Sequence, residues 1–427
     1  MDTIFALATA QGRAGVAVVR VSGPNALTVC GGLMSSLPPR RQAGLRKILD
    51  ADGAVLDEAL VLTFAAPHSF TGEDTVELHL HGSTAIVSAV LRRLSGSGAR
   101  LAEPGEFSRR ALENDRMDLT QVEALGDLIS AETEAQRVQA MRGYKGQLSQ
   151  RIEGWRANII RAAALMEATI DFADEDVPVD VTPEVMTLLE AVETEINAEL
   201  LGFASAERVR NGFEVAIMGA PNAGKSTLLN AIARRDAAIT SKHAGTTRDV
   251  IEVRMDLNGL PVTLLDTAGL RTAADEIEAE GISRALSRAK NADIRVFLMD
   301  EGEALPIVAG SDDIVLRPKA DLRDDPSESI SGKTGKGVAE LMEKLTAELS
   351  KRAALAGLAT QERHRIAMSE TCAKLAVAKN HLENGPDFYD IAAEDLRAAT
   401  RALAVLIGRV DVENLLDEIF SSFCLGK

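Results

Sequence analysis

The spacing of apolar and polar residues divides the chain into stretches of different period. In residues 1–118, short runs alternate between apolar and polar side chains, as in 16–22 (VAVVRVS) and 75–81 (TVELHLH), and glycine and proline separate the runs. Residues 86–95 have a helical pattern instead. Alternation with a period of two is typical of strands that bury one face. We therefore expect residues 1–118 to form a small α+β domain.

The next stretch, about 119–210, repeats its apolar residues at the helical period. The segment 174–178 (DEDVP) breaks this pattern once, and Thr182 and Pro183 restart it as a cap and a proline at the first helical position. Residues 360–427 are again helical in pattern. Neither helical stretch is able to bury its apolar face alone, so we expect the two to pack together in one helical domain.

Between the helical stretches the pattern becomes that of an α/β domain. Residues 213–218 (FEVAIM) are typical of a buried strand, 227–233 (TLLNAIA) begin a helix, and 262–266 (VTLLD) predict another strand. The fold expected is a multidomain α/β and α+β chain with this domain inserted into the helical one. The expected boundaries are 1–118, 119–210, 211–352 and 353–427.

The segment between the first of these strands and its helix has the spacing G-x-x-x-x-G-K-[ST] of a P-loop, since residues 219–226 read GAPNAGKS. Glycines allow backbone amides to approach phosphate oxygens, and the helix N-terminus favours negative charge. Lys225 is predicted to contact the β- and γ-phosphates, and Ser226 to bind Mg²⁺. The strand–loop–helix context therefore predicts binding of a nucleoside triphosphate.

Three later segments have the order and spacing of a Ras-like GTPase domain. Residues 245–249 (GTTRD) form a polar loop suited to close over the γ-phosphate. Asp266 ends a strand and is expected to hold Mg²⁺ through water, and the Gly269 amide is expected to contact the γ-phosphate. Residues 331–333 (SGK) resemble the loop that touches guanine from the side.

The segment that reads guanine departs from the usual N-K-x-D, since residues 318–321 are PKAD. Asp321 is still expected to accept the two guanine N–H donors, which rejects adenine, and Lys319 to lie across the base. Pro318 has no side-chain amide, so one guanine contact and part of the loop bracing are expected to be missing. We predict GTP as the nucleotide, bound more weakly than is usual for such sites.

Hydrolysis needs a device other than the Ras-like glutamine, because Leu270 occupies that position. Asn222 in the P-loop, with backbone carbonyls of 241–246, is one candidate, as a binding site for a monovalent cation. Glu278, in the acidic segment 275–278, is the other, as a general base that orients water. From spacing alone, a solvated acidic helix face is the alternative interpretation of that segment.

Composition excludes several classes of protein. The length of 427 residues suggests about three domains, and the net charge of −17 argues against broad electrostatic adhesion to nucleic acid. One tryptophan and two tyrosines do not provide a stacking surface for single strands. The cysteines Cys30, Cys372 and Cys424 are too scattered for a disulfide framework. Without a leader or a long apolar run, we expect a soluble, cytoplasmic protein that does not enter membranes.

The chain ends in FCLGK at 423–427. Together with 69–74 (SFTGED), 104–107 (PGEF), Asn222 in the P-loop and 245–249 (GTTRD), this tail closely resembles the MnmE (TrmE) family of tRNA-modification GTPases over essentially the whole chain. The resemblance implies an N-terminal domain that binds folate and forms a homodimer. It also implies a helical domain and an inserted G domain that dimerises in a potassium-dependent way during hydrolysis.

The resemblance implies an activity as well. With an FAD- and NADH-using MnmG (GidA) protein in a hetero-oligomer, the family builds a 5-carboxymethylaminomethyl-type group on C5 of the wobble uridine of certain tRNAs. The implied one-carbon donor is 5-formyltetrahydrofolate or a related tetrahydrofolate. The alternative is a regulatory GTPase switch in ribosome assembly or stress response, which needs neither the N-terminal domain nor the Cys-Leu-Gly-Lys tail.

Matched to the family motifs, particular residues acquire implied roles. The implied catalytic residues are Glu278 and Lys225, which favours the catalytic interpretation of Glu278 over a solvated helix face. The implied K⁺ ligands are Asn222, Ser241 (where the family usually has threonine), His243 through its backbone, and Thr246. The implied Mg²⁺ ligands are Ser226 and Thr247. The nucleotide site comprises Asn222, Ala223, Gly224, Lys225, Ser226, Thr227, Ser241, Thr246, Thr247, Asp266, Gly269, Lys319, Asp321 and Ser331. The implied folate site comprises Arg20, Glu77, Arg116 (often lysine in the family) and Lys427.

Read from the residues alone, the folate assignments have alternatives. Glu77 alternates with apolar neighbours, so it is also interpretable as an outward-facing strand residue. Arg20 lies among valines, and a charge in an apolar strand needs a partner or a ligand.

Two further sets of residues suggest chemistry more weakly. His79 and His81 lie two residues apart on a predicted strand, but no third metal ligand accompanies them, so we interpret them as surface or folate-pocket residues. Cys424 has no histidine near it in the sequence, which favours packing or tail docking over a nucleophile.

Overall fold

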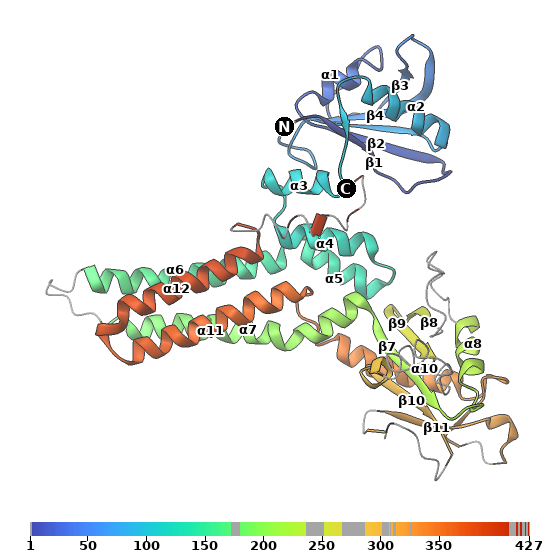
Figure 1. Cartoon of the computed structure of the whole chain (residues 1–427), viewed down its shortest axis with the longest axis vertical. Coiled ribbons are helices and arrows are strands. Elements are labelled where there is room, and N and C mark those ends of the chain that lie inside the picture. The colour runs from blue at the N-terminus through green and yellow to red at the C-terminus, as the bar shows by residue number, and fades with distance from the viewer. Residues whose placement is uncertain are drawn as a thin grey trace, which may run out of the picture. The chain divides into compact units, whose positions relative to one another are not determined.

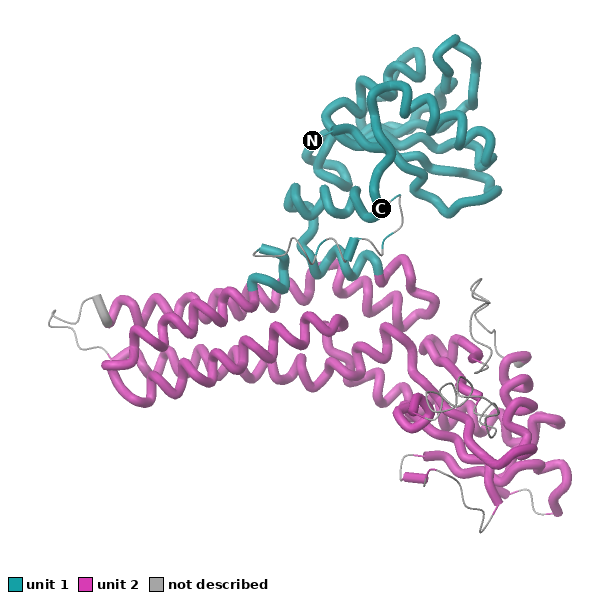
Figure 2. Tube along the Cα trace, viewed as in Figure 1, with its two compact units in different colours: residues 1–126, 404–427 teal, residues 127–403 magenta. Residues whose placement is uncertain are grey.

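The computed structural model of the chain (Figure 1) describes residues 2–171, 180–235, 252–266, 287–300, 307, 309–310, 313–324, 327–409, 416, 419–420, 423 and 426. The chain divides into two compact units (Figure 2). One unit contains residues 1–126 and 404–427, and the other contains residues 127–403. Both ends of the chain therefore belong to the same unit.

The first unit is built on a six-stranded sheet of order β3-β4-β5-β2-β1-β6, in which only β1 and β6 are parallel neighbours. The strands are β1 (Ile4–Leu7), β2 (Val16–Ser22), β3 (Gly44–Leu49), β4 (Val55–Phe64), β5 (Thr75–His81) and β6 (Arg100–Leu101). The helices are α1 (Ala26–Gly31), α2 (Thr84–Ser95), α3 (Glu106–Glu113) and α4 (Leu119–Ser130), the last of which runs to the end of this segment and beyond it. The α+β prediction is confirmed.

Alternation in β2 and β5 separates a core face from a second face of the sheet. Val19 and Leu78 lie on the core face and pack with Val90 of α2. Arg20 is the next residue after Val19 in β2, and Glu77 is the residue before Leu78 in β5. Because successive side chains alternate between faces, Arg20 and Glu77 lie on the opposite face of the sheet. The period of two thus places the charged pair away from the core beneath the helices.

The helical part of the second unit contains α5 (Glu134–Tyr144), α6 (Gln147–Asp171), α7 (Thr182–Asn211), α11 (Glu362–Glu383), the short 3₁₀ turn η2 (Pro386–Phe388) and α12 (Tyr389–Leu406). α7 packs against both α6 and α11, so the helical stretches before and after the α/β domain share one core, as predicted. Trp155 of α6 is buried there, and its Nε1 donates to Glu195 Oε2 at 2.8 Å.

The helical stretch 119–210 is broken more often than the single break predicted. A capping box of Thr133 and Gln136 starts α5, and Gly146, with φ +75°, separates α5 from α6. Thr182 is not the N-cap of α7 as expected. Val181 occupies that position, and the Thr182 hydroxyl lies 2.7 Å from the Tyr389 hydroxyl, so a tertiary contact has replaced the local cap.

The α/β part has a second six-stranded sheet, of order β12-β11-β10-β7-β9-β8, that is parallel except for β8. Its strands are β7 (Phe213–Gly219), β8 (Glu252–Leu257), β9 (Leu260–Asp266), β10 (Ile294–Leu298), β11 (Ile314–Pro318) and β12 (Ser329–Ile330). The other elements are α8 (Lys225–Arg235), the 3₁₀ turn η1 (Ala320–Leu322) and α10 (Val338–Ala353). β7 lies between β9 and β10, so the strand order reverses at β7, which is where α/β sheets bind ligands.

Two segments join the α/β part to the helices, and they lie side by side. One is the end of α7, and the other is the segment 354–361 that follows α10. The Gly357 amide donates to the Gly202 carbonyl at 3.2 Å, and a Cβ at Gly202 would lie 2.7 Å from the Gly357 nitrogen. The inserted α/β domain predicted from the sequence is thus confirmed. In the part of the chain that the structure describes, no helix is both long and apolar enough to cross a bilayer.

Candidate functional site

The loop between β7 and α8 is folded around unusual backbone conformations. Gly219 has φ +155°, and a Cβ there would lie 2.4 Å from the Leu298 carbonyl oxygen of β10. Asn222 and Gly224 have φ +63° and +93°, a region that asparagine and glycine tolerate better than other residues. Lys225 is buried within this loop, where its Nζ donates to the carbonyls of Gly219 at 2.8 Å and of the next residue at 2.9 Å.

Two oxygen ligands meet beside this loop. Asp266 ends β9 with its side chain buried, and Ser226 Oγ at the start of α8 donates to Asp266 Oδ2 at 2.6 Å. Hard oxygen donors of this kind are the ligands that Mg²⁺ prefers. Because β7 and β9 are parallel neighbours, their carboxyl ends bring the P-loop and Asp266 to one edge of the sheet. The donor set fits the predicted magnesium ion.

The segment predicted to read guanine lies at the same edge. Lys319 and Asp321 are exposed in the turn after β11, and Ser331 follows β12. Ser331 Oγ donates to Asp321 Oδ1 at 2.6 Å, and this hydrogen bond is the main reason that the pKa of the Asp321 carboxyl lies below its ordinary value. The carboxylate is therefore ionised and oriented as an acceptor.

The guanine segment also packs directly on the P-loop helix. A Cβ at Gly332 would lie 2.5 Å from the Leu228 backbone nitrogen of α8. The structure thus brings together at one edge the following predicted nucleotide-site residues: Asn222, Ala223, Gly224, Lys225, Ser226, Thr227, Asp266, Lys319, Asp321 and Ser331. The predicted residues that lie outside the described part of the chain are Ser241, His243, Thr246, Thr247, Gly269 and Glu278.

Sequence reasoning missed a brace in the guanine segment. Arg323, two residues after Asp321, donates from Nε to the Pro318 carbonyl at 2.7 Å and from Nη2 to Asp300. The only available signal was an arginine shortly after the motif, and a spacing of that kind does not identify its acceptor.

A second candidate site lies in the first unit, on the sheet face opposite the core. Arg20 and Glu77 are directly opposed on β2 and β5, and Arg20 donates from Nε and Nη2 to Glu77 Oε1 at 3.0 and 2.9 Å. The Arg20 guanidinium also lies over the rings of Phe70, 4.9 Å from its centroid, and Phe107, at 5.7 Å. Arg20 therefore has the partner that its apolar strand required, and Glu77 is paired rather than simply directed into solvent.

A pocket of about 380 Å³ adjoins this pair. It is lined by Arg41, Leu62, Phe64, His68, Ser69, Phe70 and Arg116. Leu62 is directly opposite Glu77 in the sheet, and Phe70 is both a wall of the pocket and a ring beneath Arg20. Arg116 is exposed at the pocket, with its stem against Gly72. Arg20, Glu77 and Arg116 are thus gathered around one pocket.

The end of the chain docks close to these residues. Lys427 and Cys424 lie outside the described residues, but Gly426 is buried. A Cβ at Gly426 would lie 2.2 Å from the Leu7 carbonyl oxygen at the end of β1. Ala6, which precedes Leu7 in β1, is directly opposite Arg20 on β2, so the docked Gly426 lies near Arg20.

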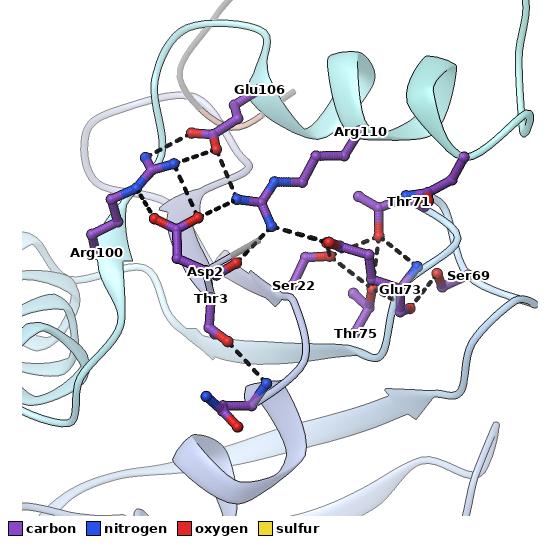
Figure 3. Close-up of polar contacts among 12 residues, drawn as sticks. Asp2, Thr3, Ser22, Ser69, Thr71, Glu73, Thr75, Arg100, Glu106 and Arg110 are labelled. Carbon is purple, nitrogen blue, oxygen red and sulfur yellow. Dashed lines mark hydrogen bonds and ion pairs between the residues drawn. The ribbon is translucent and has the colours of Figure 1, made fainter.

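Figure 3 shows a network of charged residues that links α3 and the start of the chain to the segment 69–74. Arg110 of α3 is buried, and it donates to Asp2 Oδ1 at 2.8 Å, Glu106 Oε1 at 2.8 Å and Glu73 Oε1 at 3.1 Å. Arg100 extends the network to Asp2 and Glu106. The network joins the start of the chain, β6, α3 and the loop that carries Phe70.

Hydroxyl groups anchor the same loop from the side of the sheet. Ser22 Oγ donates to Glu73 Oε2 at 2.8 Å and lies 2.7 Å from the Thr71 hydroxyl, and Ser69 Oγ donates to the Glu73 carbonyl at 2.5 Å (Figure 3). Glu73 therefore fixes the loop through both its side chain and its backbone. The sequence shows Glu73 in the segment 69–74 and Glu106 in the segment 104–107, but it does not show that Arg110 joins the two carboxylates.

The histidine pair is not arranged as a metal centre. His81 Nδ1 lies 2.7 Å from Asp57 Oδ1, and His79 Nε2 lies 3.5 Å from Glu77 Oε2. Among the residues that the structure describes, no group of three or more His, Cys, Asp or Glu side chains is placed to hold a metal ion. His79 adjoins the Arg20–Glu77 pair.

Comparisons with known proteins cover the whole chain. The family model described as "GTP-binding protein TrmE N-terminus" matches residues 3–116, and the one described as "MnmE helical domain" matches residues 119–424. A Roseobacter denitrificans protein is 61% identical over 428 residues, a Cereibacter sphaeroides protein 60% over 429, and a Ruegeria pomeroyi protein 59% over 428. Each match covers 100% of both chains, and each relative is named "tRNA modification GTPase MnmE". The chain therefore belongs to the MnmE (TrmE) family of GTPases.

Proposed function

We propose that the protein is a potassium-dependent GTPase that modifies C5 of the wobble uridine of certain tRNAs. It acts with an FAD-dependent MnmG (GidA)-type partner and a tetrahydrofolate one-carbon donor. The observation that carries the proposal is the carboxyl edge of the second sheet, where the P-loop, Asp266 and the Asp321–Ser331 pair converge. The names of the full-length relatives support tRNA as the substrate.

At this edge each residue has a distinct task in GTP hydrolysis. Lys225 exchanges its two carbonyl acceptors for β- and γ-phosphate oxygens. Ser226 and Thr247 would hold Mg²⁺ directly and Asp266 would hold it through water, and the ion would supply charge neutralisation for the transferred phosphoryl group. Asp321 accepts the guanine N–H donors.

A monovalent cation and a glutamate complete the hydrolytic site in this proposal. Asn222 is exposed at the P-loop and presents a neutral side-chain oxygen there. With Ser241, His243 and Thr246 it would bind K⁺, whose charge takes the place of an arginine finger. Glu278 would orient the attacking water, because Leu270 cannot do so.

The pocket of the first unit suits a reduced folate, such as 5-formyltetrahydrofolate. Its aromatic wall at Phe70 suits a flat ring system, and the paired Arg20 and Glu77 beside it suit the donors and acceptors of a pterin. Arg116, at the exposed side, would meet a glutamyl carboxylate, and Lys427 would approach with the docked tail.

A homodimer through the first unit is supported by an apolar stripe on the pocket face of the sheet. Leu45 and Leu60 are directly opposed on β3 and β4 and are 62% and 39% exposed, and Leu60 is paired in turn with His79. Such a stripe favours burial against a second copy. The first family model ends at 116 and the second begins at 119, which supports a boundary after residue 118. The further division into 119–210, 211–352 and 353–427 stays part of the proposal.

Nucleoside mass spectrometry of bulk tRNA, from cells with and without the gene, tests the proposal. We expect C5-aminomethyl-type wobble uridines to disappear without the gene and to be restored by the wild-type gene but not by Lys225→Ala. Unchanged uridines would refute the modification role and favour a regulatory switch in ribosome assembly or stress response.

A further inference from the structure

The turn that reads guanine has lost the usual source of its rigidity. Pro318 has neither a side-chain amide nor a backbone N–H with which to tie the turn to its neighbours. The next residue, Lys319, has φ +59° and ψ 48°, a left-handed conformation that is uncommon for any residue other than glycine. Such a conformation persists only when the surrounding structure fixes it.

One local hydrogen bond is insufficient to fix this turn. The Leu322 amide donates to the Lys319 carbonyl at 2.9 Å, which closes η1, and Ala320 packs it against the domain, but neither contact fixes the Pro318 carbonyl. Ser331 orients the Asp321 carboxylate, yet it acts on the side chain and not on the backbone that carries it. The backbone of the turn needs a separate anchor.

Arg323 provides that anchor. Its Nε donates to the Pro318 carbonyl at 2.7 Å, which spans the turn from end to end, and its Nη2 donates to Asp300, which follows β10. The planar guanidinium thus ties the turn after β11 to the end of the neighbouring strand. The Arg323 side chain is 25% exposed and Asp300 is 53% exposed, so the hydrogen bond to the Pro318 carbonyl is the better shielded of the two.

We propose that Arg323 is a positioning residue for guanine recognition in this chain, and that it replaces the bracing normally supplied by the asparagine that Pro318 displaces. The proposal rests on the GTP-binding function proposed above. In this role Arg323 acts through the turn, by holding Lys319 and Asp321 where the base is read. Its removal weakens contacts to guanine and leaves contacts to the phosphates intact.

The test measures the dissociation constants of GDP and ADP for the full-length chain as wild type, Arg323→Ala, Pro318→Asn and the double variant. We expect Arg323→Ala to weaken GDP binding about tenfold, since both hydrogen bonds that anchor the turn are lost, and to leave ADP binding unchanged. KM for GTP should rise in parallel while kcat at saturating GTP stays the same. Pro318→Asn should restore most of the loss in the Arg323→Ala background and improve the wild type less, because the two braces are alternatives.

Arg295→Ala is the matched control. Arg295 is 21% exposed and also pairs with an aspartate, Asp313, but it lies at the opposite end of β10. It should lower the melting temperature without changing GDP affinity. GDP affinity of Arg323→Ala within about twofold of wild type, or an equal fall for Arg295→Ala, would overturn the inference. Absence of GDP binding by the wild-type chain would overturn the proposed function itself, and the inference with it.

Discussion

At the scale of single residues, the nucleotide edge depends on positions where backbone approaches backbone. A Cβ at Gly219 would lie 2.4 Å from the Leu298 carbonyl oxygen, and one at Gly332 would lie 2.5 Å from the Leu228 nitrogen. Neither neighbour is able to move as a flexible side chain would. The closeness of these strands and loops is what places Ser226, Asp266 and Ser331 within one site.

Gly332→Ala should therefore separate the guanine loop from α8. We expect GDP affinity to fall by about tenfold or more and the melting temperature to drop, as judged by nucleotide titration and calorimetry. Gly335→Ala is the control in the same loop. A Cβ at Gly335 would meet no other atom, so this substitution carries only the conformational cost of a φ of +78°. Equal effects of the two substitutions would show that the contact with Leu228 does not matter.

Asn222 allows a similarly direct test of the proposed cation. Its φ of +63° means that Asn222→Gly preserves the backbone conformation while it removes the side-chain oxygen. We expect wild-type GTP hydrolysis to be faster in KCl than in NaCl, because the smaller ion fits the site poorly, and Asn222→Gly to abolish this difference. Equal wild-type rates in the two salts would count against the cation.

Replacing Glu278 by alanine should instead lower kcat in either salt with little change in nucleotide affinity.

At the scale of elements, Arg110 joins α3 and the loop 69–74 into one support, since it donates to both Glu106 and Glu73 (Figure 3). Arg110 is only 5% exposed and neutralises carboxylates from three segments of the chain. Because the loop carries Phe70, this support fixes the ring over which Arg20 lies. A buried arginine thus acts on the pocket without lining it.

Replacing Arg110 by methionine should expose this role. The substitution leaves Glu73, whose side chain is 11% exposed, without its cation, while Glu106 keeps Arg100. We expect the unpaired Glu73 carboxylate to cost about 3 kcal/mol in the free energy of unfolding of the first unit. Binding of a reduced folate, measured by calorimetric titration, should weaken as well. Adding Glu73→Gln should recover part of the stability, since it removes the unpaired charge. No recovery would mean that Arg110 acts through packing alone.

The same network predicts that the stability of the first unit depends on pH in the acid range. A hydrogen bond from Arg100 is the main reason that the pKa of Asp2 is lowered from 3.8 to about 2. Ionised Asp2 therefore stabilises the fold fully at pH values above its ordinary pKa of 3.8. That stability should be lost as the pH falls from about 4 to about 2. Calorimetry should show wild type and Arg100→Gln differing near neutral pH and converging at the acid end. A constant difference across this range would contradict the prediction.

Local sequence patterns predicted most helices and strands. Strand register and the partners of individual side chains were not predictable from those patterns. The period of two located β2 and β5, but it did not show that Arg20 and Glu77 oppose each other, because register depends on strands distant in sequence. The P-loop was recognisable from its glycines and Lys225. Arg323 was not, because its acceptor is a carbonyl that any residue could supply. Local chemistry is thus visible in the sequence, and tertiary partners are not.

At the scale of the whole molecule, the second unit is held together where its two connecting segments meet. Glu199 of α7 is 4% exposed, and its carboxylate accepts from the Leu358 amide at 2.7 Å and from Arg151 of α6. The Ala135 amide in the first turn of α5 also donates to the Gly259 carbonyl, at 2.9 Å, in the turn between β8 and β9. Movement of the α/β part relative to the helices would strain these contacts, together with the ion pair between Arg208 of α7 and Asp293.

Glu199→Ala tests this junction. The substitution leaves the Leu358 amide buried without its acceptor, so the free energy of unfolding of the second unit should fall by about 1–3 kcal/mol. Urea unfolding followed by the fluorescence of Trp155 reports on this unit, because Trp155 is the only tryptophan of the chain and lies in α6. Limited proteolysis should also cut faster within residues 354–361. Glu190→Ala, at an exposed position of the same helix, is the control, and a Glu199 variant no less stable than the control would show that the junction is not held by this carboxylate.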